Sequence, residues 1–123
     1  VLNVGAAVHQ LGADSLTIAP AGGPTGLRLR DDFARLGVPT AWIETRQPTR
    51  VCTTLLDRST GRSTELVEPS PPLTPLELQG WWTTYRDAAA RAELVVLTGS
   101  LPQGTPVDFY AELMAITRVP VLL

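Results

Sequence analysis

Apolar residues at helical spacing predict four helices along this chain. The strongest signal begins at Thr74, which can cap a helix whose first position is Pro75 and whose Glu77 lies three residues after the cap. Gly12 and Gly37 follow the first two patterns at the places where helices should end. The predicted helices lie at about residues 1–11, 27–36, 75–89 and 106–116.

Short apolar runs between these helices predict strands. They lie at residues 15–19, 41–44, 50–57, 62–68, 94–97 and 118–123. The run from Leu94 to Leu97 is apolar throughout, as a parallel strand covered on both faces requires. The two runs joined by residues 58–61 contain many polar side chains, so they predict a hairpin in a separate, partly exposed sheet.

The alternation of helices and strands is typical of an α/β protein with a doubly wound parallel sheet. A β-rich insertion at residues 40–68 separates two parts of this core, residues 1–39 and 69–123. The chain begins inside a predicted helix and stops inside a predicted strand. We therefore expect one incomplete domain, cut from a longer protein.

The composition is that of an ordinary globular protein, with 44% hydrophobic and 18% charged residues and a formal net charge of -2. The ten basic residues are all arginines scattered along the chain, which disfavours a nucleic-acid partner. No apolar run approaches the roughly 20 residues of a membrane span, and no basic start of a secretory signal is present. We therefore expect a cytoplasmic protein without a membrane partner. Cys52 and His9 each occur once, which excludes an internal disulfide and a multi-histidine metal site.

Two glycine-rich loops, at residues 22–26 and 99–104, follow predicted strands. In open parallel sheets ligands bind beyond the carboxyl ends of the strands, where such loops lie. Glycine lets the backbone approach a ligand, and the next helix offers free amides to an anion. The loops therefore favour a phosphate or polyol site, although glycines serve equally as turn residues. Neither loop has the spacing of a dinucleotide-binding motif, and without lysine neither can form a P-loop.

Five short segments occur in an order that resembles the PfkB family of carbohydrate kinases over essentially the whole chain. They are Leu2-Asn3-Val4, the loop 22–26, Thr49-Arg50, residues 64–69 and the Thr98-Gly99-Ser100-Leu101-Pro102-Gln103-Gly104 loop. Within the family the chain is most similar to 1-phosphofructokinase and tagatose-6-phosphate kinase, whose members typically carry a G-S-L-P-x-G loop and a T-R pair. The resemblance implies a ribokinase-like fold in which a small β-sheet lid closes over a sugar at the edge of the core.

The resemblance also implies which residues bind the substrate. Asn3 would contact sugar hydroxyls, whereas Arg50 and Ser100 would bind the phosphate of a sugar phosphate. A guanidinium suits that role because its planar fork offers paired charged donors. Three glycines would line the same site: Gly22, Gly23 and Gly99.

The implied activity is transfer of the γ-phosphoryl group of Mg-ATP to a hydroxyl of fructose 1-phosphate, tagatose 6-phosphate or a similar sugar. The family's catalytic aspartate and its nucleotide site would lie beyond Leu123, so we expect ATP and Mg2+ to be used by the intact parent and not by this chain alone. The exposed edge of the lid could also join two copies as a homodimer. Two other interpretations stay open: a non-catalytic ligand-binding or dimerising module, and a ribokinase- or adenosine-kinase-like enzyme acting on an unphosphorylated sugar or a nucleoside.

Overall fold

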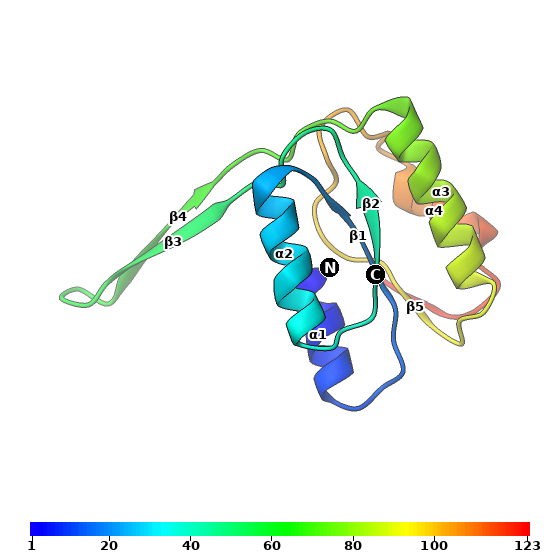
Figure 1. Ribbon diagram of the computed structural model, residues 1–123, viewed down its shortest axis with the longest axis horizontal. Helices are drawn as coiled ribbons and strands as arrows, with labels where there is room; N and C mark the ends of the chain where they lie inside the picture. The colour runs from blue at the N-terminus through cyan, green and yellow to red at the C-terminus, as the bar shows by residue number, and fades with distance from the viewer.

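Helices and strands alternate in the computed structural model, which describes all 123 residues (Figure 1). The helices are α1 (Leu2–Gln10), α2 (Gly23–Arg35), α3 (Pro75–Ala89) and α4 (Phe109–Ile116). The strands are β1 (Thr17–Ala21), β2 (Thr40–Glu44), β3 (Cys52–Asp57), β4 (Arg62–Val67), β5 (Val95–Val96) and β6 (Val121–Leu122). Every predicted helix and strand is therefore present, with boundaries that differ by a few residues.

Parallel strand pairs joined by helices form the α/β core. β1 pairs with β2 across α2, with Thr17 opposite Thr40, and β5 pairs with β6 across α4, with Val95 opposite Val121. Parallel strands need a crossover connection of this kind, so each pair and its helix make one βαβ unit. The predicted α/β class is confirmed, in the form of two parallel pairs and one separate hairpin.

The predicted insertion begins too early, because β2 belongs to the core and not to the separate sheet. Ile43 is buried, and Trp42 packs edge-on against Phe33 of α2 with ring centroids 5.7 Å apart. These apolar contacts hold β2 beside β1, although its ends, Thr40 and Glu44, are polar. The boundary predicted at residue 40 is therefore wrong for this strand, and only the chain after β2 leaves the core.

β1 lies two residues later than predicted and includes Pro20, which the sequence placed in a loop. Thr17 donates its backbone N–H to the carbonyl of Pro39, just before β2. Because alternate residues of a strand face the same edge, the nitrogen of Pro20 faces away from β2, and its missing N–H leaves this ladder intact. The connection from β1 to α2 therefore shortens to Gly22 alone.

β3 and β4 form an antiparallel hairpin, called the hairpin below, that projects from the body of the molecule (Figure 1). Every residue of both strands is exposed, so the predicted separate, exposed sheet is confirmed for these two strands. Its turn ends at Gly61, whose φ of +68° is one that glycine adopts readily. Cys52, at the base of the hairpin, is exposed and does not pack as a small apolar residue would.

The largest buried cluster lies between α3, α4 and β5. Its members are Tyr85, Leu97, Phe109 and Leu113. Trp81 and Trp82 of α3 meet Phe109 edge-on, with ring centroids 6.3 and 5.4 Å apart, so both tryptophans pack against the buried cluster. This packing anchors α4, and with it the loop that connects β5 to α4.

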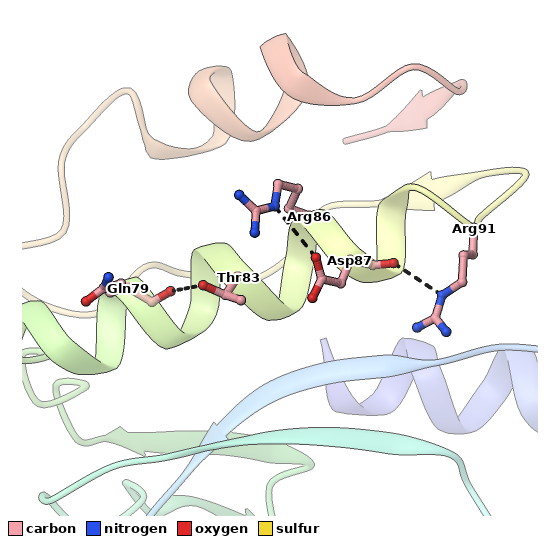
Figure 2. A network of polar contacts seen from close by, with 5 residues as sticks. All are labelled: Gln79, Thr83, Arg86, Asp87 and Arg91. Atoms are coloured by element: carbon pink, nitrogen blue, oxygen red, sulfur yellow. Dashed lines mark hydrogen bonds and ion pairs between the residues drawn. The ribbon is translucent and has the colours of Figure 1, made fainter.

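The polar contacts along the later turns of α3 are local (Figure 2). The hydroxyl of Thr83 donates to the carbonyl of Gln79 at 3.1 Å, and Arg91 donates to the carbonyl of Asp87 at 3.2 Å. Arg86 and Asp87 form an exposed ion pair at 3.6 Å, a kind of contact that contributes little to stability. None of the helices combines the length and the apolar character that crossing a bilayer requires.

Candidate functional site

Three connections meet in the region where the sequence predicts the site. They are the β1–α2 turn at Gly22, residues 45–51 between β2 and β3, and residues 97–108 between β5 and α4. Each leaves the carboxyl end of a parallel strand, which is where open α/β sheets bind their ligands.

Thr49 is held at three points by the turn that follows β1. Its backbone N–H donates to the carbonyl of Gly22 at 2.9 Å, and its hydroxyl accepts from the N–H of Gly22 at 3.1 Å. The hydroxyl of Thr25 donates to the carbonyl of Thr49 at 2.6 Å. These bonds fix the backbone immediately before Arg50.

The glycines of this turn allow the two chain segments to touch. A Cβ on Gly22 would lie 2.2 Å from the carbonyl oxygen of Thr45, and one on Gly23 would lie 2.8 Å from the Cβ of Pro48. Gly22 is buried, and its carbonyl accepts from both Thr49 and Gly26, so its backbone groups are already used within the chain. Gly23 is exposed. Close packing therefore explains Gly22, and contact of either glycine with a substrate stays a prediction.

Arg50 and Ser100, 50 positions apart in the chain, are in direct contact. Nη2 of Arg50 donates to Oγ of Ser100 at 2.8 Å, and Nη1 donates more weakly to the carbonyl of Glu68 at 3.4 Å. No carboxylate forms an ion pair with Arg50, which is half-buried. The Ser100 hydroxyl accepts from Arg50 and so keeps its own proton to donate. Together they offer a positive charge and a hydroxyl donor to an anion.

Gly99 lies at a close approach between the β5–α4 loop and Val1, the residue before α1. Gly99 has a φ of +99°, and a Cβ there would lie 3.2 Å from a methyl group of Val1. Asn3 follows in the first turn of α1, where it is exposed and makes no hydrogen bond with Arg50 or Ser100. The structure therefore brings Gly99, Ser100 and Arg50 together, whereas the predicted role of Asn3 stays a prediction.

Glu77 connects α3 to the segment that carries Arg50. Its carboxylate accepts from the backbone N–H of Thr74 at 2.5 Å, which completes the predicted capping box, and from the N–H of Arg46, also at 2.5 Å. Partial burial raises the pKa of Glu77, but the hydrogen bonds from Arg46 and Thr74 outweigh it and hold the pKa below its usual value. The carboxylate thus ties residue 46 to the start of α3.

Sequence reasoning missed the side chains that support Arg50 and Ser100. Thr25 and Tyr110 were not singled out, and Glu77 was recognised only as a helix-start residue, whereas it also holds Arg46. The sequence signals for this region are the Thr49-Arg50 pair and the loop at residues 98–104, and neither points to these supporting side chains. The partners of these side chains are backbone groups distant in the chain, which leave no residue pattern.

The residues of α3 and α4 also enclose a hollow of about 580 Å³, open to solvent, that contains none of the predicted site residues. Its lining includes Leu78, Trp82, Arg86 and Ile116. No group of three or more His, Cys, Asp or Glu side chains lies close enough together to hold a metal ion.

The βαβ units define an α/β protein that carries a guanidinium and a hydroxyl in contact at the carboxyl edge of its strands. The sequence profile of the pfkB family carbohydrate kinases matches residues 2–120. The chain therefore belongs to the pfkB family of carbohydrate kinases, and its fold is a part of the ribokinase-like α/β domain.

Three proteins from other organisms illustrate the similarity in sequence and in structure. The ATP-dependent 6-phosphofructokinase isozyme 2 of Mycobacterium tuberculosis is 38% identical over 117 residues, which are 95% of this chain and 34% of that protein. A structure of phosphofructokinase-2 from Escherichia coli in complex with fructose-6-phosphate superimposes with a TM-score of 0.82 at 27% identity, over 98% of this chain and 41% of that one. A possible 1-phosphofructokinase from Thermotoga maritima superimposes with a TM-score of 0.91 over 98% of this chain and 39% of its own, and at 24% identity it supports the fold alone. The chain thus spans about a third of the length of the Mycobacterium relative.

Proposed function

We propose that this chain is the substrate-binding part of an ATP-dependent sugar-phosphate kinase in which Arg50 and Ser100 hold the phosphate of the substrate. The observation that carries the proposal is the 2.8 Å contact between these two residues, which come from two different connections at the same edge of the core. The guanidinium has no carboxylate partner, so its charge is left for a ligand.

The proposed role of the site is to bind and orient the sugar phosphate. Charged, paired donors on Arg50 and the hydroxyl of Ser100 would bind the phosphate oxygens, and a fixed phosphate fixes the sugar relative to the core. Asn3 would contact the sugar hydroxyls from the first turn of α1. The hairpin would close over the sugar as a lid and keep water from the reacting hydroxyl.

ATP would supply the phosphoryl group, and Mg2+ would neutralise its charge. The side chains described here offer no cluster of metal ligands, so we assign no residue of this chain to the nucleotide or the metal. What this chain contributes is the binding and orientation of the acceptor.

A phosphorylated ketohexose is the substrate class that we propose. Fructose 6-phosphate, fructose 1-phosphate and tagatose 6-phosphate all carry the anion that Arg50 can bind, and the similar proteins from Mycobacterium tuberculosis and Escherichia coli are named as phosphofructokinases. An unphosphorylated sugar or a nucleoside would leave the guanidinium without a partner.

The test uses the complete gene product that contains this chain and measures binding of the three sugar phosphates and of fructose by calorimetry. Arg50→Ala should weaken binding of the preferred sugar phosphate by about 10- to 100-fold, the usual worth of a hydrogen bond to a charged group. Arg28→Ala, which removes an exposed arginine of α2, is the matched control and should leave affinity unchanged. Unchanged affinity of the Arg50 variant, or tighter binding of fructose or a nucleoside than of every sugar phosphate, would refute the proposal.

The hairpin supports a second part of the proposal, association of two copies. An isolated two-stranded hairpin is only marginally stable in water. All residues of β3 and β4 are exposed, so the rest of the chain does not cover the hairpin, and a second copy could. We propose that it pairs with the hairpin of a second copy.

A further inference from the structure

The hydroxyl of Tyr110 reaches from the first turn of α4 back to the loop that carries Ser100. It donates to the carbonyl of Gly99 at 2.7 Å and to the carbonyl of Thr98 at 3.0 Å. A phenol has one proton, so the two carbonyls share a single donor. This hydroxyl is the only side chain that hydrogen-bonds to the backbone of residues 98–100.

The bond to Gly99 sets the direction of the peptide group that leads into Ser100. The chain has no cis peptide bonds, so the carbonyl of Gly99 and the N–H of Ser100 point in opposite directions. With the carbonyl turned toward Tyr110, the N–H of Ser100 points away from it and donates no hydrogen bond within the chain. Gly99 has a φ of +99° and no Cβ to restrict its backbone. The orientation of the Gly99–Ser100 peptide therefore depends on a hydrogen bond from elsewhere in the chain.

Tyr110 is itself well anchored. Its ring packs against Phe109, with centroids 6.3 Å apart, and belongs to the apolar shell of the buried cluster between α3 and α4. Burial raises the pKa of the Tyr110 phenol above its usual value, so the group keeps its proton and stays a donor at neutral pH. The hydroxyl therefore joins the loop to the packed core.

We propose that Tyr110 is a positioning residue of the sugar-phosphate site, which orients the Gly99–Ser100 peptide so that the N–H and hydroxyl of Ser100 face the substrate phosphate together with Arg50. The inference rests on the proposed function. It adds a residue that does not touch the substrate and that acts through Ser100, and it adds the Ser100 amide to the donors of the site.

The experiment compares two tyrosines of the complete gene product. Tyr110→Phe removes only the hydroxyl, and Tyr85→Phe is the matched control, because the Tyr85 hydroxyl bonds Thr117 at 2.5 Å in the core, away from the loop. Tyr110→Phe should raise the dissociation constant of fructose 6-phosphate, or of whichever sugar phosphate binds best, by about five-fold, the worth of one net hydrogen bond. Tyr85→Phe should leave it within two-fold while lowering the melting temperature.

A double-mutant cycle with Ser100→Ala tests the route of the effect. Ser100→Ala removes the hydroxyl and keeps the N–H, so if Tyr110 orients both groups, Tyr110→Phe should still weaken binding in this background, but by less than five-fold. Equal effects in both backgrounds, an effect below two-fold in the natural background, or an equal loss in Tyr85→Phe would each overturn the inference. Failure of the proposed function would be seen in a different measurement, namely an unchanged affinity of the Arg50→Ala variant for the sugar phosphate.

Discussion

At the scale of single residues, the site depends on hydroxyl groups that orient its charged group. Arg50 can reach Ser100 because the residue before it is fixed: Thr49 bonds to Gly22 through both its N–H and its hydroxyl, and Thr25 holds its carbonyl. An arginine side chain loses much rotamer freedom when it binds a ligand. A fixed backbone at residue 49 reduces this loss of entropy for Arg50. Thr49 should therefore affect the affinity for the substrate without touching it.

Thr49→Val tests this role, since valine keeps the shape of threonine and removes the hydroxyl. The N–H of Gly22 is buried and would lose its acceptor, which should lower the free energy of unfolding by about 1–2 kcal/mol in urea denaturation. Affinity for the sugar phosphate should fall together with stability. Thr83→Val, on the exposed side of α3, provides the control and should change neither quantity, because the Thr83 hydroxyl bonds only within its own helix. Equal behaviour of the two variants would show that the Thr49 hydroxyl does not hold the turn.

At the scale of elements, the site depends on α3, although this helix contributes no residue to it. Glu77 caps the helix and binds the N–H of Arg46, so the start of α3 and the connection from β2 to β3 are one unit. The buried cluster formed with α4 gives this unit a rigid support. A local signal for a helix start thus also positions residues about 30 places earlier in the chain.

Glu77 should make the free energy of unfolding depend on pH in the acid range. Its pKa in the folded protein lies below the usual 4.5, so its contribution is complete above pH 4.5 and is lost as the pH falls through the lower folded value. Glu77→Gln keeps the size of the side chain and removes the charge, so the loss of stability between neutral pH and acid should become shallower. The variant should also be about 1 kcal/mol less stable at pH 7, the typical worth of a helix cap. Urea unfolding at a series of pH values measures both effects. Glu93→Gln is the control, and a variant with the natural pH dependence would contradict the role.

At the scale of the whole molecule, the sequence was sufficient to predict the helices and strands but not how they pack together. The capping box at Thr74 and the polar strands of the hairpin are local signals, and both are confirmed. The placement of β2 was wrong because its membership in the core depends on Phe33 and on β1, which its own residues do not encode. Motif resemblance found Arg50 and Ser100, but not Tyr110, whose partners are backbone carbonyls.

The shape of the molecule leads to the last prediction, which concerns the hairpin. Leu55 and Leu66 share one face of it, because Leu66 lies opposite Thr53, and their exposed fractions are 53% and 56%. Apolar side chains on a projecting, unpartnered hairpin favour pairing with a second copy, in which strand edges and these leucines would be covered.

Sedimentation of the complete gene product over a range of concentrations should therefore show association. Leu66→Asp should weaken it by at least about 10-fold, because a carboxylate would be buried in an apolar contact. Leu27→Asp is the matched control, since Leu27 is 63% exposed but lies on α2, and it should associate as the natural protein does. A protein that stays monomeric at every concentration, or an equal loss in the Leu27 variant, would show that the hairpin does not join two copies.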